Sequence, residues 1–320
     1  MIRVLLTGIT GQVGWELQRT LMTLGEVVPA GRKVSSAGLR MDLSQPDTIR
    51  YVIREVKPNL IINAAAYTAV DKAEAEPELA MAVNGTAPGV IAEEAKLLGA
   101  GVIHYSTDYV FNGNQSTPYT EQDEPDPQNI YGKTKLAGEK AIQAIGVPYL
   151  ILRTSWVYGL RGKNFLLTML KLAQERQELR VVDDQVGAPS WSRLIAESTA
   201  QILSQGTQDM TVFLNSNSGI YHLTATGQTS WYGFAKAIFE NISNSSHHKL
   251  KNLVAIPSKE YITPAKRPAY SSLDTHKISN TFGLCLPSWQ VNLELLLGAE
   301  SSDNLQEMVI SKPISFISYA

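Results

Sequence analysis

The chain has 320 residues, enough to bury a core in one large domain or in a large and a small domain. A formal net charge of −2 provides no general field that would attract nucleic acid or an anionic membrane surface. The single cysteine, Cys285, excludes an internal disulfide and fits a reducing cytoplasm. No apolar run approaches the roughly 20 residues of a membrane span, and the run 2–6 is too short for a signal peptide. We therefore expect a cytoplasmic protein with neither nucleic-acid nor membrane partners.

Short apolar runs alternate with helical segments through residues 1–155. Strand-like runs occur at 2–7, 26–30, 60–62, 102–106 and 149–154, and helical segments at 12–24, 46–56, 74–98 (one long helix or a helix pair) and 129–144. Alternation of this kind predicts an α/β fold with a Rossmann-type, doubly wound parallel sheet. The fourth run ends at Ser106 and Thr107, and open sheets of this type bind ligands at the carboxyl ends of their strands.

The alternation becomes less regular after Trp156. Helices are expected at 164–174, 191–203, 230–242 and 291–297, and short strands at 179–182 and 221–224, with a polar linker reaching to about residue 251. No Gly/Ser-rich linker separates the two halves. We therefore expect a smaller, interleaved C-terminal substrate-binding domain over residues 156–298, with later segments returning to the first domain. Residues 299–320 show no clear periodicity and are expected to form a tail.

The segment that joins the first strand to the first helix contains three glycines. Its candidate cofactor-binding residues are Gly8, Thr10, Gly11, Gln12, Val13 and Gly14. Glycines here allow a tight turn, a close approach of the backbone to a pyrophosphate and close helix–strand packing. The amide N–H groups at the helix N-terminus then face the phosphates. An ordinary strand-to-helix turn is the alternative, but the position near residue 7 of an α/β chain favours a dinucleotide-binding domain over residues 1–155.

Two basic residues follow the second strand, where an NAD-selective site usually has a carboxylate that holds the ribose 2′-hydroxyl. Arg32 and Lys33 would instead hold a 2′-phosphate, which favours NADPH and leaves NADH as the alternative cofactor. A solvated basic turn is an equally good interpretation. Asp42 and Leu43 are candidates to lie against the adenine, and a capping turn before Pro46 is the alternative role.

A tyrosine and a lysine, Tyr131 and Lys135, share one face of the helix expected at 129–144. An ammonium beside a phenol favours the phenolate, so the phenol can exchange a proton with a substrate oxygen near neutral pH. The spacing alone is weak, because Tyr232 and Lys236 repeat it. Position relative to the glycine segment favours the first pair, and the second is expected to be an ordinary part of an amphipathic helix.

Six segments in a fixed order carry a resemblance to a known family. They are TGITGQVGWEL at 7–17, NAAAYTAVDKAE at 63–74, YSTDYVFNG at 105–113, YGKTKLAGE at 131–139, RTSWVYG at 153–159 and RPAYSSLD at 267–274. Each segment is modest alone, but their order and spacing together are highly specific. The chain resembles the extended short-chain dehydrogenase/reductase superfamily and, within it, closely resembles the dTDP-4-dehydrorhamnose reductase family over residues 1–297.

The resemblance implies an NAD(P)H-dependent oxidoreductase of nucleotide sugars. Its reaction would reduce the C4 ketone of dTDP-4-dehydro-L-rhamnose to dTDP-L-rhamnose, the last step in supplying this sugar for cell-surface polysaccharide. Tyr131 would donate the proton to the C4 oxygen, and Lys135 would lower the pKa of that tyrosine and hold the nicotinamide ribose. Thr107 would hydrogen-bond the developing alkoxide.

Further roles follow from the same resemblance. Thr68, Tyr109 and Trp156 would line the sugar pocket together with Thr107 and Tyr131, although Thr68 could be a helix cap and Trp156 a core residue. The cofactor site would also include Ala64, Ala65 and Ala66. Members of the family can pair as homodimers with Mg²⁺ near the interface. Glu16 is the matching position for that metal, but a carboxylate in a first helical turn also suits the helix dipole.

Two other functions remain open at this point. One is a nucleotide-sugar epimerase or 4,6-dehydratase of the same superfamily. A dehydratase typically follows its threonine with Asp and then Glu, whereas Thr107 is followed by Asp108 and Tyr109. The other is a non-catalytic subunit that resembles the regulatory subunit of methionine adenosyltransferase, which has the same fold and a similar Tyr/Lys pair.

Overall fold

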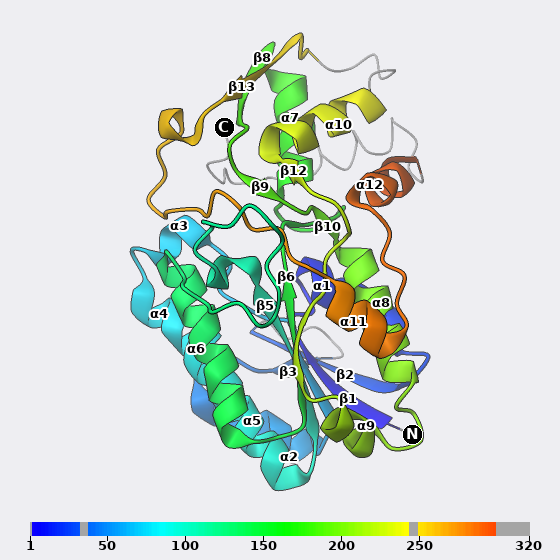
Figure 1. The fold of residues 1–320 in the computed structure, drawn as a ribbon. Coiled ribbons are helices and arrows are strands. Elements are labelled where there is room, and N and C mark those ends of the chain that lie inside the picture. The colour runs from blue at the N-terminus through cyan, green and yellow to red at the C-terminus, as the bar shows by residue number, and fades with distance from the viewer. Residues whose placement is uncertain (1, 33–37, 243–248, 299–320) are drawn as a thin grey trace.

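The computed structural model describes residues 2–32, 38–242 and 249–298. Within these residues, seven parallel strands form one sheet in the order β11-β6-β5-β4-β1-β2-β3 (Figure 1). They are β1 (Ile2–Thr7), β2 (Gly25–Gly31), β3 (Leu39–Arg40), β4 (Leu60–Asn63), β5 (Gly101–Thr107), β6 (Tyr149–Thr154) and β11 (Gly219–His222). The predicted doubly wound parallel sheet is confirmed. Its strand order reverses beside β1, so the carboxyl ends of β1 and β4 flank the crevice where such sheets bind ligands.

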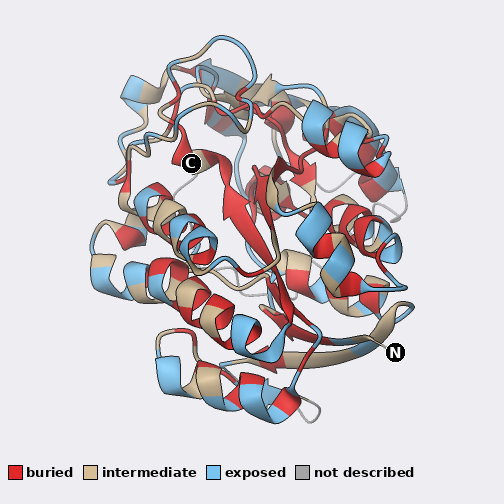
Figure 2. Ribbon diagram, turned by 60° about the horizontal axis from the view of Figure 1, so that its bottom comes forward, coloured by how far each residue is buried: buried red, intermediate tan, exposed pale blue. Residues whose placement is uncertain are grey.

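Helices cover both faces of the sheet. One face carries α2 (Pro46–Val56), α5 (Ala87–Leu98) and α6 (Ile130–Ile145), and the other carries α1 (Gln12–Leu21), α8 (Ser192–Ser204), α9 (Met210–Ser216) and α11 (His276–Phe282). The central strands are therefore buried on both sides (Figure 2), and all seven residues of β5 are buried. Burial on both faces explains why these strands are continuous apolar runs in the sequence.

A smaller layer lies beyond one end of the sheet, at the top of Figure 1. Its elements are α7 (Phe165–Glu175), α10 (Trp231–Asn241), α12 (Trp289–Gly298) and the parallel pair β8 (Glu178–Val182) and β13 (Asn252–Ile256). Two short pairs join it to the sheet: β7 (Val157–Tyr158) with β10 (Ser190–Trp191), and β9 (Val186–Gly187) with β12 (Thr229–Ser230). Phe165, Phe234 and Leu293 belong to its core, and burial of each such side chain contributes ~1.5–3 kcal/mol.

The later part of the chain also returns to the large sheet. β11 pairs with β6, and α8 packs on α1. The segment around Arg267 lies against the first half, because the guanidinium of Arg267 forms a two-point ion pair with Asp71, with the closer contact at 2.8 Å. Asp71 belongs to α3 (Val70–Ala73), and its carboxylate also accepts the backbone N–H of Ala265 at 3.1 Å. These contacts place the start of the RPAYSSLD segment beside α3.

Several elements differ from those expected. The helix or helix pair expected at 74–98 begins at residue 77 and consists of α4 (Pro77–Met81), a π-helical turn η1 (Ala82–Thr86) and α5. The turn places the Asn84 amide between the backbone of Tyr67 and the Thr134 hydroxyl, to which Nδ2 lies at 3.2 Å. β3, α9, β13 and α11 were not expected, because each is too short to show a clear period. Two 3₁₀ turns complete the described part of the chain, η2 (Asp108–Val110) and η3 (Ser258–Glu260).

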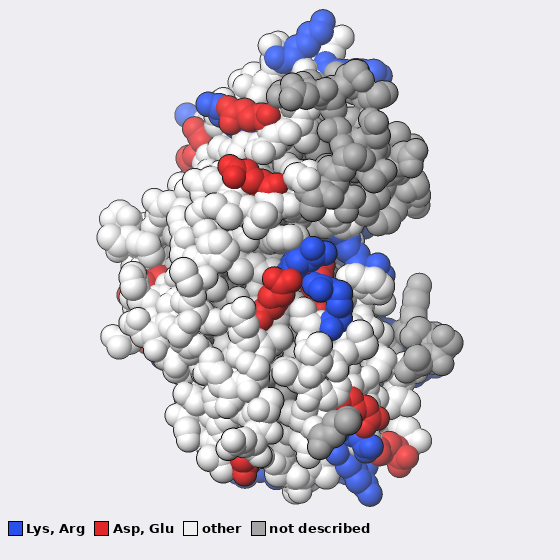
Figure 3. All heavy atoms as spheres, turned by 90° about the vertical axis from the view of Figure 1, so that its right-hand side faces the viewer, with Lys and Arg blue, Asp and Glu red and all other residues white. Residues whose placement is uncertain are grey.

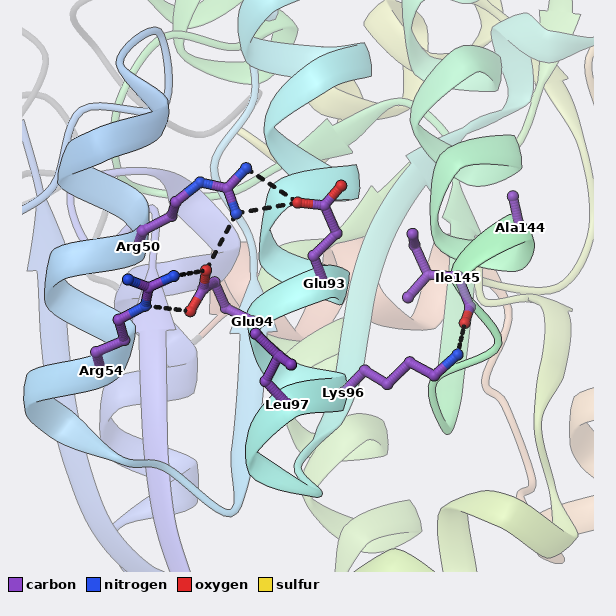
Figure 4. A pocket seen from close by; sticks show the side chains of 8 residues that line it. All are labelled: Arg50, Arg54, Glu93, Glu94, Lys96, Leu97, Ala144 and Ile145. Carbon is purple, nitrogen blue, oxygen red and sulfur yellow. Dashed lines mark hydrogen bonds and ion pairs between the residues drawn. The ribbon is translucent and has the colours of Figure 1, made fainter.

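A shallow pocket between α2, α5 and the end of α6 is built from ion pairs (Figure 4). Glu94 is buried, and its carboxylate accepts hydrogen bonds from Arg54 at 2.7 Å and from Arg50 at 3.0 Å. The hydrogen bonds from these two arginines lower the pKa of Glu94 against the opposing effect of burial. Since the charged groups already satisfy one another, the pocket joins the helices rather than offering a free ionic site.

The described helices contain no apolar stretch long enough to cross a membrane. On the face that looks to the right in Figure 1, acidic and basic side chains lie side by side in small groups (Figure 3). Ion pairs also join α1 to α8, where Arg19 contacts both Glu16 and Glu197. Mixed groups of this kind agree with the near-neutral net charge of the chain. The expected tail at 299–320 lies outside the described residues.

Candidate active site

The glycine segment forms a tight loop at the carboxyl end of β1. Gly8 has a φ of +74°, which favours glycine, and the N–H of Gly11 donates to the Gly8 carbonyl at 2.8 Å. A Cβ atom at Gly14 would overlap the Gly8 carbonyl oxygen, and one at Gly8 would overlap the backbone of Ala64. The loop therefore needs glycine at both positions to pack α1 and β4 against β1.

The N-terminus of α1 is open to an anion. Gly11 is its N-cap residue, no side chain caps the helix, and the first turn contains no acidic residue. The amide N–H groups of such a turn point outward and carry partial positive charge. This arrangement fits a pyrophosphate group, and Thr10, Gln12 and Val13 lie at this turn, as expected for residues that would contact it.

The other expected cofactor residues occupy the same edge of the sheet. Ala64, Ala65 and Ala66 follow β4 in an irregular segment, and the Ala65 N–H approaches the Thr7 hydroxyl at 3.3 Å. The side chain of Gln12 instead bridges toward the second half of the chain, with Nε2 donating to the Val157 carbonyl at 3.1 Å. The loop is thereby attached to the short strand β7.

The described residues that follow β2 and β3 differ in their exposure and in their contacts. Arg32 directly follows β2 and is exposed, whereas Lys33 lies outside the described residues. Asp42 accepts hydrogen bonds from the backbone N–H and the hydroxyl of Ser44, at 3.0 and 2.8 Å. Leu43 is buried in the core beneath α2. Asp42 thus takes part in the turn before Pro46, and its contact with the adenine stays a prediction.

Helix α6 presents Tyr131 and Lys135 from its first turns. Asn129 caps this helix, with Oδ1 accepting the Gly132 N–H at 2.8 Å and Nδ2 donating to the Lys266 carbonyl at 2.8 Å. Gly132 lies so close to the Tyr109 carbonyl that a Cβ atom would overlap it. The ring of Tyr131 meets that of Tyr109 edge to face, with ring centroids 5.8 Å apart. Both tyrosines are partly exposed.

Lys135 lies under the end of β5. Its side chain is 1% exposed, and Nζ donates to the Tyr105 carbonyl at 2.6 Å and lies 3.1 Å from His104 Nε2. Burial lowers the pKa of Lys135 to about 8, although the charge of Glu139 opposes the change. A lysine in this range can change its charge near neutral pH, which an exposed lysine does not do.

Thr107 ends β5 and begins the 3₁₀ turn η2. Its hydroxyl donates to the Asp108 carboxylate at 3.0 Å and accepts the Tyr109 N–H at 3.2 Å. Asp108 is buried, and burial raises its pKa to about 7 despite hydrogen bonds from Ser271 and Thr107. Thr107 and Asp108 thus place a buried hydroxyl group beside a buried carboxyl group, and the charge of the carboxyl group changes close to neutral pH.

A second network holds β5, β6 and α6 together behind these residues. Glu139 forms a two-point ion pair with Arg153, with contacts at 2.6 and 2.9 Å, and both side chains are 1% exposed. The same carboxylate accepts the Ser106 hydroxyl. Loss of one partner from a buried pair typically costs ~3–5 kcal/mol. Glu139 therefore holds α6 in register with the strand end that carries Thr107.

Trp156 lies at the entrance to the second half of the chain, in an unusual backbone conformation. Its φ of +45° is rare for a large side chain, and such strain persists only where the surroundings impose it. Its indole stacks on Trp231, and Gly187 lies so close to its edge that a Cβ atom would come 2.6 Å from Cε2. Thr68 is exposed beyond β4, on the loop held by Asn84.

The second Tyr/Lys pair lies elsewhere. Tyr232 and Lys236 are on α10 in the smaller layer, and Lys236 is 59% exposed beside Glu240 at 3.9 Å. Its ammonium therefore has the environment of an ordinary surface lysine. The contrast agrees with the choice of Tyr131 and Lys135 as the candidate catalytic pair.

The surroundings of Glu16 do not fit magnesium. Its carboxylate contacts the guanidinium groups of Arg19 at 3.2 Å and Arg193 at 3.5 Å. In addition, the described residues contain no group of three or more His, Cys, Asp or Glu side chains arranged to hold a metal ion. Two adjacent cations oppose a divalent metal, so the magnesium expectation gains no support and no chemical step involves it.

Sequence reasoning missed three buried polar residues around the site. Asp108 was used only to judge a dehydratase, although it directly follows Thr107 at a strand end. His104 and Asn84 gave no signal, because a lone histidine in an apolar run and an asparagine in a helical stretch are common. A search for polar residues within otherwise apolar strands would have found His104.

The comparisons with known proteins agree with this arrangement. The family model described as "RmlD substrate binding domain" matches residues 2–301. A dTDP-4-dehydrorhamnose reductase of Escherichia coli (strain K12) is 47% identical over 297 residues, covering 92% of this chain and 97% of the relative. A protein of the same name from Burkholderia thailandensis is 45% identical over 292 residues, covering 90% and 96%.

A solved structure agrees with the fold as well. The crystal structure of a dTDP-4-dehydrorhamnose reductase from Bacillus anthracis in complex with NADP has a TM-score of 0.82 and 34% identity to this chain. The match covers 93% of this chain and 99% of the other.

Proposed function

Because the chain belongs to the RmlD substrate binding domain family, we propose that it reduces dTDP-4-dehydro-L-rhamnose to dTDP-L-rhamnose with NADPH. The protein is an NADP-dependent oxidoreductase of dTDP-rhamnose biosynthesis. The observation that carries the proposal is the position of Tyr131 and Lys135 on α6, beside the end of β5 that carries Thr107 and across from an uncapped α1 N-terminus.

The open cofactor edge fits a dinucleotide. The glycine loop and the first turn of α1 would surround the pyrophosphate, with Ala64, Ala65 and Ala66 beside the nicotinamide end and Asp42 and Leu43 beside the adenine end. Exposed Arg32 would contact the 2′-phosphate, which favours NADPH over NADH. When bound, the cofactor supplies the hydride that reaches the C4 carbon of the sugar.

The proton in this proposal comes from Tyr131. Its phenol would donate to the C4 oxygen as negative charge develops there, and the ammonium of Lys135 would stabilise the resulting phenolate. Thr107 would donate a second hydrogen bond to the same oxygen. In the structure its hydroxyl donates to Asp108, so this role requires the hydroxyl to turn toward the substrate. Protonated Asp108 could donate to Thr107 and thereby favour that orientation.

The sugar pocket would be formed between the sheet edge and the smaller layer. Trp156, supported by Trp231, would present its indole to the apolar side of the deoxysugar, and Tyr109 and Thr68 would line the cleft on the side of α6. The same proposal includes a cytoplasmic location and a homodimer.

The test is oxidation of NADPH, followed at 340 nm, with enzymatically prepared dTDP-4-dehydro-L-rhamnose. The expected result is oxidation of one NADPH for each substrate molecule. A folded protein that oxidises no NADPH would favour the non-catalytic subunit, and interconversion of sugars without net oxidation would favour an epimerase.

A further inference from the structure

Three strands contribute one polar residue each to a row across the sheet. Thr7 on β1 is in register with Asn63 on β4, and Asn63 is in register with His104 on β5. Lys135 on α6 continues the row from the side of the helix. The row therefore connects the residue that precedes the glycine loop to the lysine of the candidate catalytic pair.

The row is continuous and buried. Thr7 Oγ1 lies 2.7 Å from Asn63 Oδ1, Asn63 Nδ2 lies 3.1 Å from His104 Nδ1, and His104 Nε2 lies 3.1 Å from Lys135 Nζ. All four side chains are between 1% and 2% exposed. Burial, together with the nearby ammonium of Lys135, lowers the pKa of His104 well below its usual value, so the imidazole is neutral.

A neutral imidazole has one N–H group and one lone pair, so the row must have a direction. When Lys135 is an ammonium, it donates to Nε2 of His104. The Nδ1–H of His104 then donates to the side-chain oxygen of Asn63, and the Asn63 NH2 group donates to the Thr7 hydroxyl. When Lys135 is a neutral amine, each bond reverses: Nε2–H donates to Nζ, the Asn63 amide donates to Nδ1, and the Thr7 hydroxyl donates to Oδ1. The Asn63 amide supplies both patterns by turning over, since its two ends have nearly the same shape.

We propose that His104 and Asn63 are positioning residues that satisfy Lys135 in both of its charge states and thereby set the pH at which it loses its charge. The Tyr105 carbonyl accepts from Nζ in both states, so the position of the nitrogen is constant while the rest of the row reverses. The catalytic consequence is that the charge of Lys135 governs the pKa of the Tyr131 phenol. Only this consequence rests on the proposed function.

The charged and titratable groups around Lys135 support this role. Glu139 on the same helix favours the ammonium, and burial opposes it. Glu139 is itself paired with Arg153, so its charge is largely balanced. Among the described side chains from the strands, His104 is the group that contacts Nζ directly. Removal of this acceptor would leave the buried ammonium with the Tyr105 carbonyl.

Substitutions at His104 and Asn63 separate this role from simple packing. His104→Leu removes both hydrogen bonds, and the midpoint of the Lys135 titration is expected to fall by about one pH unit, because the bond to the ammonium is stronger than the bond to the neutral amine. His104→Gln can donate or accept at the same place and is expected to remain close to the wild-type midpoint. In Asn63→Asp, the ionised carboxylate can only accept hydrogen bonds. It therefore favours the pattern in which Lys135 is an ammonium, and the midpoint of the Lys135 titration is expected to rise.

The control is His222→Leu. His222 on β11 is also a buried, neutral histidine, with Nδ1 3.2 Å from the Asp274 carbonyl, and it does not contact Lys135. This variant is expected to lose stability without changing the Lys135 midpoint. It therefore shows what the loss of a buried imidazole does by itself.

The primary measurement follows the ¹³Cε chemical shift of Lys135 against pH by NMR, with Lys135→Arg used to assign the signal. It needs no turnover, so its outcome is independent of whether the reductase proposal holds. The second measurement is the alkaline limb of the kcat profile, which should move with the NMR midpoint. An unchanged midpoint in folded His104→Leu, or equal shifts in His104→Leu and His222→Leu, would overturn the proposal.

Discussion

The indole of Trp156 lies face to face with the indole of Trp231, with ring centroids 3.5 Å apart and planes 5° apart. Trp156 comes from the end of the large sheet, and Trp231 begins α10 in the smaller layer. The contact therefore links the two parts of the chain at the wall of the proposed sugar pocket. Since Trp156 also has a left-handed backbone conformation, the stacking partner is part of what holds it there.

Replacement of Trp231 by Leu should weaken sugar binding. The stacked pair contributes about 0.5–1.5 kcal/mol beyond its buried area, so KM for the nucleotide sugar should rise about 2- to 10-fold with kcat less affected. Steady-state kinetics with saturating NADPH measure this change. Trp289→Leu is the control, because Trp289 is buried in the same core and packs on Phe234. An equal rise in KM for both variants would contradict a specific role for the stack.

Replacement of Tyr131 by Phe should remove the proton donor and leave the fold intact. The side chain is partly exposed, and the substitution removes only one oxygen from it. We expect kcat to fall about 10²–10⁴-fold, the usual contribution of a positioned general acid, with little change in the dissociation constant of NADPH. Tyr232→Phe is the matched control and should retain activity. Near-normal turnover by Tyr131→Phe would show that the proton comes from another group.

Replacement of Arg32 by Ala should affect NADPH far more than NADH. A charge-assisted hydrogen bond to the 2′-phosphate is worth about 1.5–3 kcal/mol, so the dissociation constant of NADPH should rise at least about 10-fold. Fluorescence titration with each cofactor measures the two constants separately. Arg176→Ala, which changes an exposed arginine in the smaller layer, should alter neither. Equal losses for NADPH and NADH would remove Arg32 from the 2′-phosphate site.

Replacement of Asp108 by Asn should stabilise the protein in a pH-dependent way. The pKa of Asp108 is raised from 3.8 to about 7 in the folded state, so its contribution to stability is complete below pH 3.8 and is lost as pH rises through 7. The amide introduced by the substitution does not ionise, so the stability advantage of the variant should grow between about pH 4 and 7 and then level off. Urea unfolding at several pH values measures this difference, and a constant difference would contradict a buried, titrating carboxyl group.

The sheet and the principal site could be predicted because their signals are local. Each parallel strand is a continuous apolar run, and Tyr131 and Lys135 lie on one helix four residues apart. The row from Thr7 to Lys135 could not be predicted in this way, because it depends on the lateral register of strands that are far apart in the chain. The π-helical turn at Asn84 was also invisible, since its residues fit an ordinary helix pattern.

The stacked tryptophans illustrate the same limit. Trp156 was expected in the sugar pocket from its motif, but Trp231 lies 75 positions later, on a helix predicted only as amphipathic. Likewise, Glu16 matched the motif position for a metal ligand, whereas one of the two arginines that oppose this role, Arg193, comes from the distant helix α8. Pairings between distant segments decide both cases, and a single sequence does not contain them.

The most direct test of the central claim is the fate of deuterium from NADPH labelled at both C4 positions of the nicotinamide. The product with dTDP-4-dehydro-L-rhamnose should be dTDP-L-rhamnose that carries one deuterium at C4 of the sugar, formed in equal amount to the NADP⁺ released. Mass spectrometry and NMR of the purified sugar nucleotide measure both quantities. A product without deuterium at C4, or an intact substrate in the presence of folded protein, would contradict the account.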